Sequence, residues 1–368
     1  MKSCNHKFYG LSVPFSIISI FCVLIISFNS REISEGITSA INMILNVTVP
    51  ALFPVFTVSY FFLNSGLKES TRRKLHTVFF RSFGLSGNCM EAVLCGLTGG
   101  YNISLKAAVR LFNDKKISRE EAQRLSLFFT CPGISFCLNI AGIAVYNSRL
   151  TGLIILISNI LSSVISAAVF NLFKKNTPSY LPFNDKKSFY SALINAVNCS
   201  SSAIISVSFW IILFSAVNSV AVKLIKAPFI TELLTLSGEV TASVFYASKH
   251  HSIYVLSFFL TFGGICIFLQ QLPDLYTVGI PAIKFLSVRL IQSLLSTVIL
   301  KIFLTFLPLA EFTSVPVYTF KAASGTFYAS LSLFLLCAVT MMSNRYKEKH
   351  RIRQYKKRIY NNRTCEQK

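Results

Sequence analysis

A single carboxylate stands inside one of the most apolar stretches of the chain. Glu239 lies in the segment "PFITELLTLSGEVTASVFYAS" (228–248), where its only acidic companion is Glu232 and no basic residue occurs. In apolar surroundings a carboxylate has to be hydrated, protonated or hydrogen-bonded. Such a group could hydrogen-bond a polar molecule or carry a proton. The alternatives are a structural hydrogen bond to a neighbouring helix and a position closer to water.

Glu239 belongs to one of two pairs of similar phrases, and these phrases contain glycines and uncharged polar residues. "LTGGYNIS" (97–104) matches "LSGEVTAS" (236–243), and "CPGISFCLN" (131–139) matches "FGGICIFLQ" (262–270), in the same order. Glycines let the chain turn and let a ligand approach the backbone. Amide and hydroxyl groups suit a neutral hydroxyl-rich or heterocyclic ligand, although each one alone is more often a contact between helices. We expect a substrate site formed by Gly99, Gly100, Asn102, Asn139, Gly238, Glu239, Thr241, Gly263, Gly264 and Gln270.

The composition places these residues in a membrane protein. Of the 368 residues, 53% are hydrophobic and only 14% are charged, whereas charged residues approach a quarter of an ordinary soluble domain. Apolar runs near the length of about 20 residues that crosses a hydrocarbon core recur along the chain. We therefore expect an all-α polytopic membrane protein in a lipid bilayer. The clearest runs are 11–28, 136–146 with its flanks, 152–173, 203–222, 253–271, 285–307 and 326–342.

The formal net charge of +22 comes from Lys and Arg residues in short loops and in the C-terminal tail. This distribution favours a positive-inside bias over a nucleic-acid partner, and the tail could also contact anionic lipid. The ten cysteines form no CxxC pair, so we expect no disulfide framework, no metal and no cofactor. The regions expected on the cytoplasmic side are the N-terminus, 68–81, 106–124, 174–187 and the tail.

These basic loops determine which apolar segments can cross the membrane. Segment 84–104 lies between two cytoplasmic loops, so we expect a re-entrant hairpin that turns near Gly99 and Gly100. Segment 125–146 leads outward, and segment 228–248 is expected to form a second hairpin that enters from outside. The result is about eight transmembrane helices plus two re-entrant hairpins. Because the hairpins approach the middle from opposite sides, we expect an inverted repeat.

This topology predicts five parts. Within 37–187, Pro50 and Pro54 are expected to break a helix. In the same stretch Ser118 and Glu121 form a capping-box pattern that predicts a short helix. The parts are an N-terminal transmembrane helix and short loop (1–36), a first repeat with a broken helix, a hairpin and two helices (37–187), a second, inverted repeat (188–310), a last transmembrane helix (311–343) and a basic cytoplasmic tail (344–368).

The chain carries no enzyme signature. The five histidines all lie in expected loops or termini, and the sequence has no GxSxG, HExxH or Walker motif. We therefore expect a protein that is not an enzyme. Inverted repeats with broken helices are instead the architecture of secondary transporters, which hold their substrate near the middle of the bilayer.

At these motifs the sequence resembles the YlbJ-type sporulation integral membrane proteins, which belong to the nucleoside-recognition (Gate) domain family. The similar stretches are "PALFPVFTVSYFF" (50–62), "CGLTGGYNISLKAAVRLFNDKKISREEAQRLSLFF" (95–129), "GEVTAS" (238–243) and "FGGICIFLQ" (262–270). The family usually has a proline where Thr98 stands and a basic residue where Asn102 stands. Family residues carry over to Gly96, Gly100, Glu239, Thr241, Gly263, Gly264 and Gln270.

The resemblance implies a multi-pass protein of the bacterial cytoplasmic or forespore membrane, linked to spore cortex formation. It also implies a core similar to the two-hairpin core of concentrative nucleoside transporters. We therefore expect a protein that transports or recognises a small polar, nucleoside-like solute. A non-transporting scaffold that recruits partners during sporulation is the alternative, and assembly into a homo-oligomer stays open.

Overall fold

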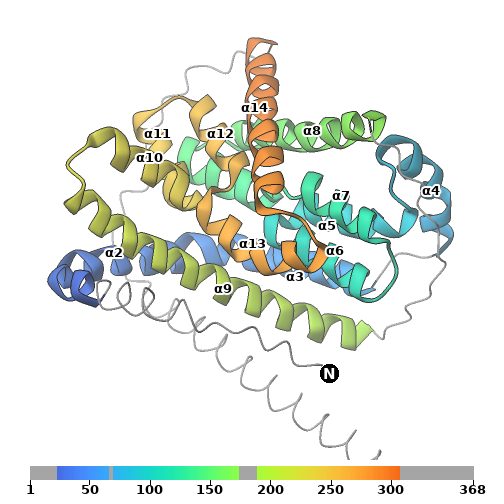
Figure 1. The fold of residues 1–368 in the computed structure, drawn as a ribbon, viewed down its shortest axis with the longest axis horizontal. Coiled ribbons are helices and arrows are strands. Elements are labelled where there is room, and N and C mark those ends of the chain that lie inside the picture. Colours follow the sequence, from blue (N-terminus) through green and yellow to red (C-terminus); the bar gives the residue numbers. More distant parts are fainter. Residues whose placement is uncertain (1–22, 66–68, 174–188, 307–368) are drawn as a thin grey trace, which may run out of the picture.

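A computed structural model describes residues 23–65, 69–173 and 189–306, and these residues form helices and no strand (Figure 1). Residues 30–128 form α2 (Ser30–Met43), the π-helical η1 (Ile44–Thr48), α3 (Val49–Ser65), α4 (Glu69–Phe83), the short η2 (Gly87–Cys89), α5 (Met90–Gly99), α6 (Tyr101–Asn113) and α7 (Arg119–Phe128). Residues 136–306 form the π-helical η3 (Phe136–Val145), α8 (Arg149–Phe173), α9 (Phe189–Leu224), α10 (Pro228–Gly238), α11 (Val240–His250), α12 (Ile253–Phe262), α13 (Gly264–Val278) and α14 (Ala282–Phe306).

Five helical stretches among the described residues are long and apolar enough to cross a membrane. This confirms a helical, multi-pass membrane protein. In Figure 1, α9 runs along one side of the molecule, and α14 crosses α8. Helix α14 contacts both α8 and α12. The five stretches are Ser30–Ser65, Arg149–Phe173, Phe189–Leu224, Ile253–Val278 and Ala282–Phe306.

The described residues do not contain all eight predicted spans. Segment 125–146 is not one helix, because its first residues end α7 and the rest forms the short η3 after an irregular stretch at 129–133. Pro132 and Gly133 cause this split, since proline blocks the helical conformation of the residue before it. The predicted span 326–342, most of 11–28, and the parts 311–343 and 344–368 lie outside the described residues.

The helix that contains Pro50 and Pro54 is continuous, contrary to the predicted break. Helical structure runs from Ser30 to Ser65 and passes the expected boundary at residue 36. The distortion is the π-helical turn Ile44–Thr48, which comes just before Pro50. A π turn accommodates the missing proline N–H, because its hydrogen bonds already depart from the regular helical spacing.

The chain reverses direction between α5 and α6. Gly100 has a φ of +91°, a left-handed conformation that favours glycine. A Cβ on Gly96 would lie 2.6 Å from the hydroxyl oxygen of Ser104. These residues are eight positions apart and would be about 12 Å apart in a straight helix. The helices α5 and α6 therefore lie side by side as a pair of short helices, with the turn between them at Gly100.

A second reversal joins α10 and α11. Glu239 is the single residue between them and has an extended backbone (φ −127°, ψ 132°). His251 Nε2 lies 2.6 Å from a carboxylate oxygen of Glu232, which only a chain that turns back at Glu239 allows. In Figure 1 this pair lies toward one end of the molecule, and the α5–α6 pair lies toward the other.

The two helices that follow the hairpins are interrupted. The first interrupted helix consists of α7 and η3, and the second consists of α12 and α13. The chain between α12 and α13 bends at Gly263 and Gly264, with φ values of +87° and +75°.

The predicted capping box at the start of α7 is confirmed. The Glu121 N–H donates to the Ser118 hydroxyl at 3.2 Å, and the Ser118 N–H donates to the Glu121 carboxylate at 2.9 Å. One apolar core unites α3, the hairpins and the interrupted helices.

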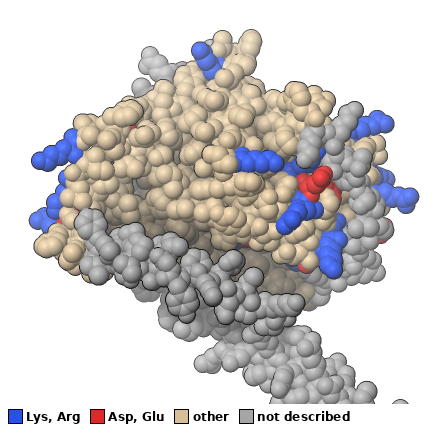
Figure 2. Space-filling model, in the orientation of Figure 1, with Lys and Arg blue, Asp and Glu red and all other residues tan. Residues whose placement is uncertain are grey.

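The surface matches a protein embedded in lipid. On the face drawn in Figure 2, uncharged residues predominate and basic side chains stand in a few separate places. Large exposed apolar side chains recur along α8, α9 and α14, such as Phe209, Leu213 and Leu294. Because soluble proteins rarely expose such continuous apolar surface, these faces are suited to contact with the bilayer.

Candidate functional site

Each hairpin turn packs against the interruption of the helix that follows it. A Cβ on Gly133 would lie 2.9 Å from the Gly100 nitrogen and from the Thr98 carbonyl oxygen. A Cβ on Gly264 would lie 3.0 Å from the Gly238 carbonyl oxygen and 3.2 Å from that of Ser237. Backbone meets backbone in both places, and only a glycine permits this approach.

The repeated phrases make equivalent hydrogen bonds as well. In the first copy the Asn139 amide donates to the Ser135 hydroxyl at 3.0 Å, and in the second the Gln270 amide contacts the Cys266 sulfur at 3.3 Å. Four residues separate the partners in both cases, and each pair occupies the same place in its phrase. Equivalent positions making equivalent contacts support an internal repeat that brings the two hairpin turns together.

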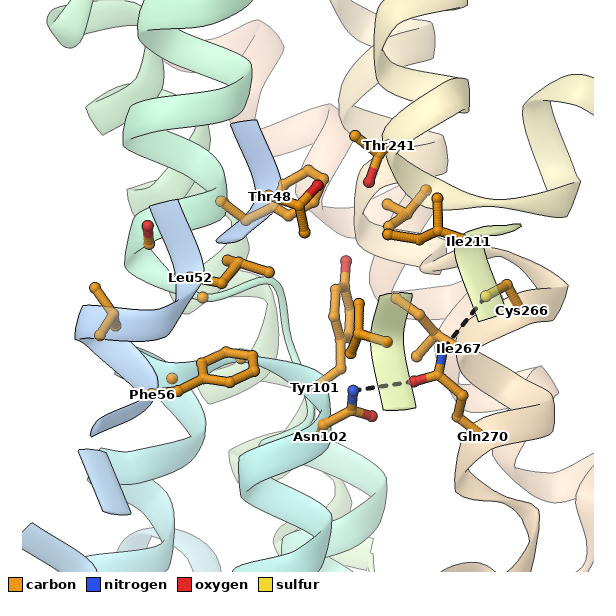
Figure 3. A pocket seen from close by; sticks show the side chains of 18 of the residues that line it. Thr48, Leu52, Phe56, Tyr101, Asn102, Ile211, Thr241, Cys266, Ile267 and Gln270 are labelled. Carbon is orange, nitrogen blue, oxygen red and sulfur yellow. Dashed lines mark hydrogen bonds between the residues drawn. The ribbon is translucent and has the colours of Figure 1, made fainter. Parts of the chain in front are cut away.

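Residues of the two hairpin turns border a small cavity of about 50 Å³. Figure 3 shows Thr48 and Thr241 at one end of it, Asn102 and Gln270 at the other, and the ring of Tyr101 between them. Apolar side chains of α3 and α9, including Leu52, Phe56 and Ile211, form another wall. A few water molecules fit into such a volume. The cavity thus offers polar groups from several segments and an apolar wall.

Glu239 lines this cavity and is 6% exposed. Its two carboxylate oxygens accept hydrogen bonds from the backbone N–H groups of Thr241 at 2.9 Å and Ala242 at 2.7 Å, so it is the N-cap of α11. Glu239 also borders a second cavity of about 110 Å³ on the side of α9. Each oxygen accepts one backbone bond and keeps further acceptor capacity, so capping does not prevent it from contacting a ligand.

Direct hydrogen bonds join the first hairpin to the second half. The Asn102 amide donates to the Gln270 side-chain oxygen at 3.0 Å (Figure 3). The Tyr101 hydroxyl donates to the Leu260 carbonyl, and the Tyr101 carbonyl accepts from the Gln271 amide at 3.1 Å. The turn at Gly100 is therefore anchored to both sides of the interruption between α12 and α13.

The structure brings most of the predicted site residues together. Glu239, Thr241, Gly99, Gly100, Asn102 and Gln270 line the first cavity, and Gly238 lines the second. Gly263 and Gly264 form the interruption that supports the hairpin turn and do not line the first cavity. Asn139 lies in η3 and does not line it either, because its amide turns back to Ser135.

Three residues with a central position were missed from the sequence. Thr48 lines the cavity with a buried hydroxyl that has no hydrogen-bond partner within the described part of the chain. Tyr101 joins the halves, and Arg289 is 2% exposed in the middle of α14. The charge of Arg289 inside an apolar run was a usable signal, whereas Thr48 and Tyr101 carry none that a single sequence reveals.

Comparison of the chain with family models, with curated proteins and with solved structures finds no match. Among the described residues, no group of three or more His, Cys, Asp or Glu side chains is placed to hold a metal ion.

Proposed function

We propose that this chain is an integral membrane protein that transports or senses a small polar, nucleoside-like solute, and that it serves spore cortex formation in spore-forming bacteria. The cortex role rests on the YlbJ-type resemblance of the repeated motifs. The protein carries out no covalent chemistry in this proposal, and it acts by binding the solute and changing conformation. Its membrane is the cytoplasmic or forespore membrane.

The observation that carries the proposal is a cavity whose polar groups come from both repeats. The first repeat supplies Asn102, and the second supplies Glu239, Thr241 and Gln270. Secondary transporters place their substrate at such an interface between repeats. Hydroxyl and amide groups hydrogen-bond the polar edges of a solute, and apolar side chains such as Phe56 cover its less polar face.

The narrowness of the cavity supports a change between two conformations. About 50 Å³ is too little for a molecule built of a sugar and a base. A solute of that size enters only if the hairpins separate from the interrupted helices. Re-entry of the hairpins into the membrane from opposite sides is part of this proposal, because it would let the site open to one side at a time.

The test is complementation of a spore former that lacks the gene. The Glu239→Gln variant removes the negative charge and keeps an oxygen acceptor, and we expect loss of spore cortex at a normal membrane level of the protein. The matched control is Glu232→Gln, which changes the other carboxylate of the α10–α11 hairpin, outside the cavity. We expect this control to support cortex formation.

Two further measurements separate a functional loss from a loss of stability. Blots report the abundance of each variant, and the melting temperature of the purified protein reports the cost of the altered cap, expected to be about 1 kcal/mol. Full complementation by Glu239→Gln would show that the carboxylate is not needed. Attention would then move to the scaffold alternative, for which loss of residues 344–368 should abolish cortex formation.

A further inference from the structure

Arg289 is the largest fully buried side chain in the described part of the chain. The two other basic residues of α14, Lys284 and Lys301, are exposed. Among the described residues, no carboxylate forms an ion pair with Arg289. A buried positive charge without an acidic partner is costly unless other groups compensate it.

Backbone carbonyl groups provide this compensation. One terminal nitrogen of the Arg289 guanidinium, Nη1, donates to the carbonyl oxygen of Thr130, and the other, Nη2, donates to that of Thr261. Thr130 lies just beyond the end of α7, and Thr261 lies in the last turn of α12. Carbonyl groups at helix C-termini lack partners within their helix and carry partial negative charge, so each helix end benefits from the cation.

The two threonines occupy equivalent places in the repeat. Each threonine is the residue immediately before its matched phrase. Thr130 precedes "CPGISFCLN" (131–139), and Thr261 precedes "FGGICIFLQ" (262–270). Each threonine hydroxyl also donates to the carbonyl four residues earlier, Ser126 at 2.8 Å and Ser257 at 2.7 Å. One guanidinium therefore binds the same carbonyl of both repeats, which places it where the two halves meet.

Neighbouring side chains hold the guanidinium in this position. The Gln292 side-chain oxygen accepts from Arg289 at 2.9 Å, and its amide donates to the Phe128 carbonyl at 2.9 Å. The Arg289 guanidinium carbon lies 5.4 Å from the centre of the Tyr101 ring, a cation–π distance. Tyr101 follows the first hairpin turn, so the network reaches from α14 to that turn.

We propose that Arg289 is a built-in cation that fastens the two interrupted helices to each other. Carbonyl groups of unwound helices and helix C-termini are the groups that coordinate monovalent cations in transporters. Here the guanidinium takes that place permanently, because it is part of α14. The same rigid guanidinium makes both bonds, so displacement of one helix end either breaks its own bond or pulls the guanidinium away from the carbonyl of the other helix. The two interrupted helices therefore move together. This inference does not depend on the solute.

Chemical rescue tests the charge and the shape of the site. The full-length chain with Arg289→Ala is purified in phospholipid nanodiscs, and its melting temperature is measured with millimolar guanidinium chloride, urea or sodium chloride. We expect a lowered melting temperature that guanidinium largely restores and that urea and sodium chloride do not, because urea has a similar shape without the charge. The control Lys284→Ala should melt like the unaltered protein and respond to none of the additives.

Hydrogen exchange tests the fastening itself. In Arg289→Ala the segments 129–135 and 262–266 should exchange faster together, and guanidinium should restore the protection of both. Faster exchange in only one segment would overturn the proposal, as would a melting temperature equal to that of the unaltered protein, rescue by urea to the same degree, or no rescue by guanidinium.

If Arg289→Ala does not fold, two more conservative variants test the same proposal. Arg289→Lys keeps the charge but cannot reach both carbonyl groups with a planar fork, and Arg289→Gln loses the charge. We expect the melting temperatures to decrease in the order Arg, Lys, Gln. Equal melting temperatures of the Lys and Gln variants would contradict a role of the charge.

Discussion

Among single residues, Thr48 shows how the cavity differs from a core. The residue is 1% exposed, and its hydroxyl has no hydrogen-bond partner within the described residues. A buried hydroxyl without a hydrogen bond costs about 1–3 kcal/mol. Most threonines among the described residues avoid that cost by donating to a backbone carbonyl three or four positions earlier, as Thr57 does with Phe53 at 2.9 Å. A hydroxyl left unpaired in a cavity wall is available to a bound molecule.

Replacement of Thr48 by valine keeps the shape of the side chain and removes the hydroxyl. We expect the free energy of unfolding to stay the same or to rise by about 1 kcal/mol. Uptake of labelled uridine by proteoliposomes should lose about fivefold to tenfold in affinity, because one hydrogen bond to the solute is missing. Thr57→Val is the control on the same helix and should leave uptake unchanged. A destabilised Thr48→Val with normal uptake would contradict a role in binding.

At the scale of elements, the hairpin turns and the interrupted helices fit together through glycines. Gly133 touches the backbone of residues 98–100, and Gly264 touches that of Ser237 and Gly238. The space around Gly238 itself is different, because a Cβ there would meet only the Phe214 ring, at 3.6 Å. The close approach therefore depends on the glycine of the interrupted helix, and not on every glycine of the motif.

Substitution of Gly133 by alanine places a methyl group 2.9 Å from three backbone atoms. We expect the free energy of unfolding to fall by about 1–3 kcal/mol, the usual cost of an overpacked site. Gly238→Ala should change stability by less than about 1 kcal/mol, because the added methyl group makes an ordinary contact. Melting temperatures of the two purified variants decide the matter, and equal values would show that the turn and the interruption are not packed as described.

For the whole molecule, the arrangement of the two hairpins in the membrane is the central question. Lys115 follows the first hairpin, and Lys249 lies at the end of the second. Both side chains are exposed. If the hairpins enter the membrane from opposite sides, these two positions face opposite compartments.

Thiol labelling of intact cells tests this arrangement. Lys115→Cys and Lys249→Cys are introduced separately into a chain whose ten native cysteines are replaced. A membrane-impermeant maleimide should label Lys249→Cys in intact cells, and Lys115→Cys only after permeabilisation. Labelling of both positions from the same side would exclude an inverted arrangement, and the proposal of access from alternating sides would fail with it.

The sequence by itself determined the features that depend on composition and on short stretches. Low charge and long apolar runs are enough to predict a helical membrane protein, because the bilayer allows few other structures. The turn at Gly100, the reversal at Glu239 and the cap of Ser118 on α7 follow from residues within a few positions of one another. The matched phrases also predicted the glycine-containing turns and the interruptions of the helices that follow them, since equivalent sequences fold alike.

Only the tertiary structure decided which groups complete the site. Asn139 and Gln270 have the same place in the repeat, yet only Gln270 lines the cavity and bonds Asn102. Thr48 joins them from a helix outside the matched phrases, and Arg289 binds carbonyl groups 159 and 28 residues away in sequence. Backbone carbonyls look the same in every sequence, and distances between remote segments depend on the packing of all helices. For this reason no local pattern predicts these contacts.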